Sequence, residues 1–261
     1  MMRIATYNIN GINKRLTNLL DWLADRQPDV VCLQELKATD AHFPIAEIKA
    51  ARYDAIWLGE SRWNGVAILS QDQTPILTCR KLPGDENDEQ ARYIEAAVGG
   101  VIVASIYAPN GNPQPGPKFD FKLAWLARLR ARAQELVRAD APIVLAGDFN
   151  VAPAPNDIYE TKSYDANALV LPESRVAFQS LLDLGLTDAL RHLHPQEAIY
   201  TFWDYRRQRW ERNAGLRLDH LLLNANAMAL LSAAGVDRPV RGMENASDHA
   251  PIWVDLDGPA R

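Results

Sequence analysis

The sequence predicts an α+β protein in which two stacked β-sheets carry helices on their outer faces. Ten short apolar segments are strand-like, whereas only four segments show the apolar period of three to four residues that is typical of helices. Hydrophobic residues make up 48% of the 261 residues, which is enough for a sizeable core. Since neither a linker-like segment nor a repeat period is visible, we expect one domain over residues 1–261.

The predicted elements follow one another along the whole chain. Strands are expected where apolar runs are bounded by turn-forming residues, at positions 3–9, 29–35, 53–58, 65–70, 75–82, 93–98, 100–108, 142–149, 216–224 and 250–256. Helices are expected where apolar side chains recur at helical spacing, at positions 14–26, 119–140, 174–185 and 225–235. Gly185 and Gly235 are the expected ends of the last two helices.

Charge and cysteine content narrow the class of protein. The net charge of −5 argues against a protein that coats nucleic acid by bulk electrostatics, although a local basic surface stays possible. No secretory leader and no membrane-spanning run is visible, so we expect a cytoplasmic protein without a membrane partner. Cys32 and Cys79 lie inside apolar strand-like segments, which favours buried free thiols in a reducing compartment.

Polar side chains gather at the ends of six predicted strands. A single Asn or Asp at such a position is usually a turn former or a helix cap, and that ordinary interpretation comes first for Asn10 and Asp188. Six such ends are harder to explain one by one and predict a shared site at the strand edges. The residues are Asn8, Asn10, Glu35, Tyr107, Asn110, Asp148, Asn150, Asp219, Asp248 and His249.

Four of these residues are carboxylates that would repel one another without a cation. Oxygen ligands favour Mg²⁺ or Mn²⁺ over zinc as the divalent ion. His249 can neutralise charge that develops on a phosphate, with Asp219 as a candidate for the carboxylate that holds its ring. Metal, carboxylate, imidazole and amide groups together predict hydrolysis of a phosphoester by an activated water. The four carboxylates are Glu35, Asp148, Asp219 and Asp248.

The segment from Phe202 to Arg217 combines aromatic rings with basic side chains. It holds five arginines against two acids, within a chain that is acidic overall. One interpretation is a solvated hairpin with a few core aromatics. The sequence gives this interpretation support for Arg207, Arg209 and Trp210. The other is a surface where arginines bind phosphates and rings enclose a sugar or a base.

Nine motifs, in order along nearly the whole chain, resemble those of bacterial exonuclease III. This is the abasic-site endonuclease family within the endonuclease/exonuclease/phosphatase superfamily. The motifs read YNINGIN, CLQELK, NGVAILS, YAPNGN, GDFNVAP, GLTDALR, YTFWDYR, GLRLDHLLL and SDHAPIW. The span from TFWDYR to GLRLDH is specific to the DNA-repair branch. The resemblance implies a four-layer α/β/β/α sandwich of two mostly antiparallel sheets flanked by helices.

The resemblance also implies a role for each matching position. Glu35, with help from Asn10, is expected to hold Mg²⁺ (or Mn²⁺), and Asp248 to organise the metal side or a second metal. Asp148 is expected to position or deprotonate the attacking water, which Asn150 aligns. The implied partner is double-stranded DNA with abasic sites or 3′ ends, and a monomer is the simplest expectation.

Further implied roles concern the phosphate and the sugar. His249, supported by Asp219, is expected to contact the scissile phosphate. Contacts to phosphate oxygens or the DNA backbone are expected from Asn8, Tyr107, Asn110, Arg206 and Arg217. A pocket for a flipped-out abasic sugar is expected from Phe202, Trp203 and Leu218.

Two other functions stay open at this point. The first is another phosphoesterase of the superfamily, acting on RNA, an inositol phosphate or a lipid; such enzymes generally use a second His at the end of a central strand, where this chain reads YAPNGN. The second is an inactive DNA-binding module, against which the complete set of site residues argues. Arg206 departs from the bulky group that related enzymes often carry there, and residues 156–171 match the family poorly. The balance between abasic-site cleavage and 3′-end processing is undecided.

Overall fold

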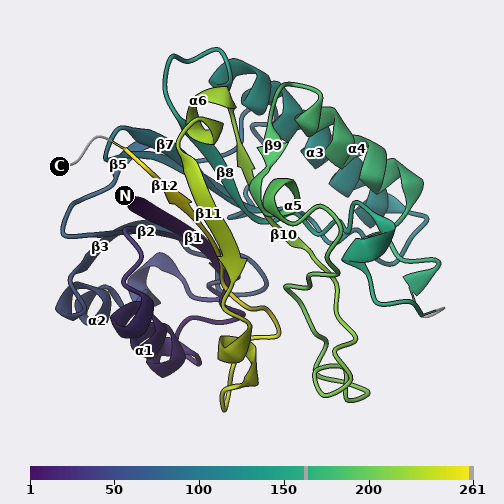
Figure 1. Cartoon of the computed structure of the whole chain (residues 1–261), viewed down its shortest axis with the longest axis horizontal. Coiled ribbons are helices and arrows are strands. Elements are labelled where there is room, and N and C mark those ends of the chain that lie inside the picture. The colour runs from purple at the N-terminus through teal and green to yellow at the C-terminus, as the bar shows by residue number, and fades with distance from the viewer. Residues whose placement is uncertain (162–163, 259–261) are drawn as a thin grey trace.

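Two six-stranded sheets lie face to face in the computed structural model, which describes residues 1–161 and 164–258 (Figure 1). All ten predicted strands are present. The spatial order of the first sheet is β11 (Leu231–Val236), β12 (Ile252–Leu256), β1 (Met2–Asn8), β2 (Val30–Gln34), β4 (Val66–Gln71) and β3 (Tyr53–Leu58). The spatial order of the second sheet is β5 (Ile76–Cys79), β6 (Tyr93–Val98), β7 (Val101–Tyr107), β8 (Ile143–Asp148), β10 (Asp219–Leu223) and β9 (Thr187–Asp188).

Each sheet is antiparallel except for one parallel pair near its centre. β1 pairs in parallel with β2, and β7 pairs in parallel with β8. A parallel pair needs a long crossover, and here it is a helix in both cases: α1 (Leu16–Arg26) and α3 (Pro117–Leu136). Because parallel strands end at the same edge, each central pair delivers two carboxyl ends to one side of its sheet.

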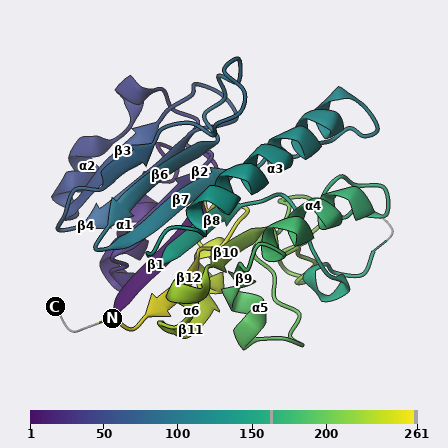
Figure 2. The ribbon, with the colours of Figure 1, turned by 90° about the horizontal axis from the view of Figure 1, so that it is seen from above.

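Helices cover the outer face of each sheet, which gives four layers (Figures 1 and 2). α1 and α2 (Ile45–Ala50) pack on the first sheet, and α3 and α4 (Pro172–Leu182) pack on the second. β2 shows how the sequence supports this arrangement. Val30 and Cys32 face the second sheet while Val31 and Leu33 face the helices, so the strand is apolar throughout. The predicted sandwich is confirmed.

The helix expected at residues 225–235 is wrong. α6 covers only Ala225–Met228, and the rest of the segment forms β11 at the edge of the first sheet. Pairing with β12 overrides the helical apolar pattern, and a Cβ at Gly235 would lie 2.7 Å from the ring of Trp253. Gly235 is therefore a packing position and not a helix stop. The other three predicted helices are present. Further short helices are η1 (Asp40–His42), η2 (Pro155–Asp157), α5 (Ala189–Leu193) and η4 (Arg238–Gly242).

Two sequence expectations about the whole molecule can be compared with this fold. Cys32 and Cys79 are both free, the first buried and the second half-buried. Among the described residues, no helix combines the length and the apolar character needed to cross a membrane.

Candidate active site

The polar strand ends of both sheets meet at one edge of the sandwich. Asn8 ends β1 and is fully buried. Its Nδ2 donates to Glu35 Oε1, just after β2, at 2.9 Å and to Asp148 Oδ2, at the end of β8, at 3.0 Å. One amide thus joins the first sheet to the second, which brings together residues 140 positions apart in the chain.

The backbone after β8 turns sharply so that Asp148 and Asn150 point into the same space. Gly147 lets β8 lie close against β7, since a Cβ there would overlap the carbonyl oxygen of Ile106. Asn150 has a left-handed backbone (φ 51°), and its N–H donates to Asp148 Oδ1 at 2.8 Å. Its side-chain Nδ2 donates to the carbonyl oxygen of Ala108 at 2.9 Å. The carboxylate and the amide are therefore held rigidly.

His249 and Asp219 form a buried pair beside Asp148. His249 Nδ1 lies 2.8 Å from Asp219 Oδ2, and His249 Nε2 lies 3.8 Å from Asp148 Oδ2. Burial alone would lower the pKa of His249, but Asp219 and Asp148 together raise it to about 10. The ring is then an imidazolium at neutral pH, with its Nε2–H free to donate to a substrate oxygen.

Asp148 has the properties of a general base. Burial raises the pKa of this carboxyl group to about 7; Asp219 and Glu35 add to the shift, and His249 opposes it. A base works best when its pKa lies near the working pH. Asp148 can therefore take up a proton near neutral pH and release it again.

The remaining predicted ligands lie on the other side of Asn8. Asn10 Nδ2 donates to Asp248 Oδ1 at 2.8 Å. The ammonium of Lys37 lies 2.7 Å from Glu35 Oε2 and 2.6 Å from Asn10 Oδ1. Burial would raise the pKa of Glu35, but Lys37 and Asn8 hold it below its usual value, so this ligand is ionised. The positive charge of Lys37 already lies between Glu35 Oε2 and Asn10 Oδ1, the two oxygens expected to bind the metal. This set of oxygen donors therefore fits a hard cation.

The four carboxylates of the site do not surround one point in the described part of the chain. Asp219 is committed to His249, and Asp148 to Asn8 and Asn150. Across residues 1–161 and 164–258, no three His, Cys, Asp or Glu side chains are spaced to hold one metal ion. A metal on the Glu35 side would have few protein ligands, which suits Mg²⁺ because that ion keeps several waters.

Tyr107 and Asn110 complete the rim of the site on the second sheet. Burial, reinforced by Glu35 and Asp148, raises the pKa of Tyr107 well above its ordinary value, so the phenol stays protonated and can donate. Asn110 Nδ2 donates to Asn150 Oδ1 at 3.1 Å.

Lys122 is a residue of this site that the sequence interpretation missed. Its side chain is fully buried on α3, and Nζ donates to the carbonyl oxygens of Asn150 at 2.6 Å, Ala168 at 3.1 Å and Asn110 at 3.3 Å. It therefore fixes the backbones that carry the two amides. The available signal was a lysine on the apolar stripe of a predicted helix, three residues after Phe119.

The structure argues against the expected phosphate contact of Arg217. The side chain is buried, with Nε 2.6 Å from Asp157 Oδ1 and Nη1 2.5 Å from Asp188 Oδ2. It is the centre of what we call the Arg217 cluster. This cluster consists of Asp157, Asp188, Arg191, Arg217 and His220. Arg206, by contrast, is exposed and pairs with Asp204, so its predicted DNA contact stays a prediction.

The predicted sugar pocket is also altered. Phe202 lies beside the site, with its ring 4.9 Å from that of His249. Trp203 is buried against Trp210, with ring centroids 5.0 Å apart, and lines a cavity near β11, so its predicted pocket role has no support. Leu218 is buried in an apolar cluster against which Phe202 packs.

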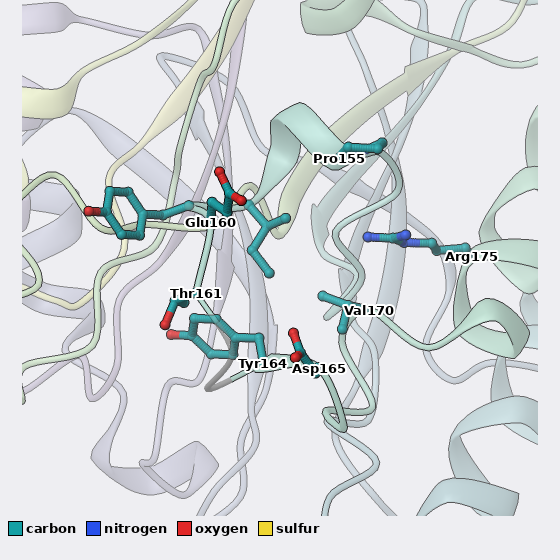
Figure 3. A pocket seen from close by; sticks show the side chains of 9 residues that line it. Pro155, Glu160, Thr161, Tyr164, Asp165, Val170 and Arg175 are labelled. Atoms are coloured by element: carbon teal, nitrogen blue, oxygen red, sulfur yellow. The ribbon is translucent and has the colours of Figure 1, made fainter.

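Described residues of the segment that matches the family poorly, in 156–161 and 164–171, line a hollow of about 990 Å³ next to this cluster (Figure 3). Ile158 and Val170 line the hollow and pack against the cluster that contains Leu218. Two acids, Glu160 and Asp165, line it against one arginine, Arg175, and the excess of negative charge disfavours a phosphate there.

Comparison with known proteins decides the family. A family model described as "Endonuclease/Exonuclease/phosphatase family" matches residues 5–249. The chain belongs to this family. An exodeoxyribonuclease III of Haemophilus influenzae is 33% identical to it, over 98% of this chain and all of the relative.

Two solved structures of the family are closely similar. One is a 3′ phosphatase of Neisseria, NExo, bound to a product DNA hairpin, with a TM-score of 0.95 and 39% sequence identity. The match covers 99% of this chain and 100% of that chain. An AP endonuclease from Archaeoglobus fulgidus has a TM-score of 0.93 and 34% identity over the same shares of the two chains. The predicted family, its fold and its nuclease activity are thereby confirmed, while the roles of the individual site residues stay predictions.

Proposed function

We propose that this DNA-repair nuclease of exodeoxyribonuclease III type hydrolyses phosphoester bonds of duplex DNA at abasic sites and at 3′ ends. One observation carries the proposal: a buried carboxylate with a pKa of about 7 lies 3.8 Å from a buried imidazolium, in an edge shared by two sheets. The spacing is too long for a direct hydrogen bond. It leaves both groups available to a water and a phosphate oxygen.

In the proposed reaction Asp148 accepts a proton from water while the water oxygen bonds to phosphorus and the bond to the leaving oxygen breaks. Asn8 donates to Asp148 Oδ2, and the Asn150 N–H donates to Oδ1, so the carboxylate cannot rotate. His249 Nε2–H donates to a non-bridging phosphate oxygen and neutralises its growing charge. Tyr107 donates to a second phosphate oxygen.

The family is metal-dependent, and we propose Mg²⁺, or Mn²⁺, as the ion. Glu35 and Asn10 would hold it, with Asp248 orienting Asn10 through the 2.8 Å hydrogen bond. Lys37 would have to withdraw from both oxygens, and its half-exposed side chain has room to do so. When bound, the ion supplies positive charge to the leaving oxygen.

A gel assay tests the function. A labelled duplex with an internal abasic analogue is compared with duplexes that end in a 3′ hydroxyl or a 3′ phosphate, each with Mg²⁺ or with a chelator. We expect cleavage that needs the divalent ion, and no turnover of a soluble phosphoinositide. Binding of every duplex without any cleavage would indicate an inactive DNA-binding module, and full activity in chelator would remove the metal from the reaction.

The similarity to a 3′ phosphatase at 39% identity favours including 3′-end processing in the proposal. We also propose that the protein acts as a single-domain monomer in the cytoplasm, where Cys32 and Cys79 stay reduced. Light scattering after size-exclusion chromatography tests the monomer, and a mass of twice 29.1 kDa would contradict it.

A further inference from the structure

A basic cavity lies next to the metal side of the site. It has a volume of about 400 Å³. No carboxylate is among the side chains that line it, in a chain whose net charge is negative. The lining residues are Lys14, Arg15, Tyr205, Arg241, Met243, Asn245 and Ala246.

Two of the three basic side chains are buried without a negative partner. Arg15 and Arg241 are each 8% exposed, and neither lies within ion-pair distance of a carboxylate in the described part of the chain. Arg15 donates to the carbonyl oxygen of Asn10 and, at 3.1 Å, to Tyr205 Oη. Arg241 donates to the carbonyl oxygen of Trp203 at 2.9 Å. The Nε atoms of both arginines are buried and have no hydrogen-bond partner there.

Buried guanidinium groups are normally compensated by carboxylates, because an isolated buried charge is costly. The buried Arg217 follows this rule with two aspartates. Arg15 and Arg241 do not, although aromatic rings face Arg241: those of Tyr205 at 4.9 Å and Trp210 at 5.5 Å. The missing negative charge is therefore expected from a ligand.

The fold adds two features that favour an anion. Lys14 and Arg15 directly precede α1, and no acidic side chain lies in the first turn of this helix. The positive end of the helix dipole and its free N–H groups thus face the same region as the basic side chains. Because the first turn of α1 has no acidic side chain, no negative charge in that turn offsets the positive end of the dipole.

We propose that this cavity binds a phosphate group of the DNA backbone. This phosphate group is not the one that is cleaved. The inference rests on the proposed function. Asn10 links the cavity to the site, because its carbonyl oxygen accepts from Arg15 and its Nδ2 lies 3.4 Å from Tyr205 Oη. A duplex whose scissile phosphate sits at Asp148 and His249 continues along this edge, and phosphate contacts fix its register. Binding there would also hold the backbone of Asn10 in place.

The first experiment tests the anion site without DNA and without metal. Thermal unfolding of the full chain is followed in chelator with increasing inorganic phosphate at constant ionic strength. We expect phosphate to raise the Tm, and we expect this rise to shrink in Arg241→Gln and in Lys14→Ala. Lys14 is exposed, so Lys14→Ala remains informative if Arg241→Gln does not fold.

Matched controls lie at the opposite edge of the first sheet. Lys49 pairs with Asp54 and Arg52 with Asp72, beside the start of β3, whereas the site is at its far end. Lys49→Ala and Arg52→Gln are expected to keep the full phosphate response. An equal response in all variants overturns the proposal.

The second experiment asks whether the phosphate belongs to DNA. Duplex affinity is measured against salt concentration in the chelated protein. We expect Lys14→Ala and Arg241→Gln to bind about tenfold more weakly and to reduce the slope of log K against log salt by about 1. A phosphate-dependent Tm with unchanged duplex affinity would mean that a free phosphate compound is the ligand and would overturn the DNA assignment. If the wild type proves to lack nuclease activity, the Tm experiment still decides whether the cavity binds phosphate.

Discussion

Two groups of buried charges in this protein are built in opposite ways. The Arg217 cluster sets two aspartates against two arginines, with ion-pair distances of 2.5–2.6 Å. Burial would raise the pKa values of Asp157 and Asp188, but Arg217 lowers both below their usual range. The charges of this cluster are therefore satisfied within the fold.

The catalytic edge, which we define as Glu35, Asp148, Asp219 and His249, is not satisfied in this way. The pKa of Asp148 is raised to about 7 by burial and by its acidic neighbours, and Asp219 Oδ1 is buried without a hydrogen-bond partner in the described chain. Unrelieved charge of this kind marks a functional site, because a substrate or an ion can supply what the fold leaves out. Satisfied charge contributes to stability instead.

The largest expected effect is on turnover at the catalytic edge. Asp148→Asn removes the base and should lower the rate by about 10²–10⁴ while duplex binding is kept. Stability should not fall, since the change removes a carboxylate whose ionisation burial disfavours. Single-turnover cleavage and thermal unfolding measure the two effects.

The matched control is the same substitution in the Arg217 cluster. Asp157→Asn should lower the Tm and leave the rate of the folded protein close to that of the wild type. Near-normal turnover of Asp148→Asn would show that another group is the base.

The next effect is on stability. Arg217→Met leaves two aspartates buried without their main partner and should cost about 3–5 kcal/mol of unfolding free energy. Arg206→Met, at an exposed pair with Asp204, should change it by less than about 1 kcal/mol. Urea unfolding at pH 7 compares the two variants. Equal losses would mean that the cluster is not what stabilises this region.

A smaller effect concerns the alkaline limit of activity. In the proposed reaction His249 must be charged to neutralise the phosphate, so activity should fall as pH rises through its pKa of about 10. Asp219→Asn removes the largest stabilising partner of the imidazolium, so this pKa falls and the alkaline limb of kcat moves to lower pH. On the acid side, activity should fall through the Asp148 pKa of about 7. An unchanged alkaline limb in the variant would remove the imidazolium from the reaction.

The smallest expected effect is the dependence on acidic pH of the stability that the Arg217 cluster contributes. Lowered aspartate pKa values contribute stability that is present above the unfolded-state pKa of about 3.9 and lost as pH falls through the folded-state values. The stability gap between wild type and Arg217→Met should therefore narrow between about pH 5 and pH 2. Urea midpoints at several pH values test this, and a constant gap would speak against a titrating cluster.

Much of the site was accessible from the sequence because its residues end strands. A strand is recognised from local apolar pattern, and a carboxylate or an amide directly after it has few other places to point. Asp148, Asn150 and Glu35 were found in this way. The helix expected over residues 225–235 failed because an edge strand can be specified by its partner, here β12, and not by its own pattern.

The sequence did not reveal which charged residues belong to the candidate active site and which stabilise the fold. Arg217 precedes Asp219 by two residues and lies in a basic, aromatic segment, so its residue type and position favoured a DNA contact. Only the position of Asp157, 60 residues away, makes it a buried structural charge. Lys122 shows the reverse case, since a lysine for which the sequence analysis predicted no role donates to the backbone of Asn150.

The sequence by itself determined ten of the twelve described strands, their polar ends and the family, since these depend on short-range pattern and on motifs in order. The pairing of Asp219 with His249 was already expected from the sequence. Tertiary structure alone decided that Asp157 pairs with Arg217 and that Arg15 and Arg241 have no carboxylate partner in the described chain. The physical reason is that burial and pairing set the state of a charged group, and both depend on residues far away in the chain.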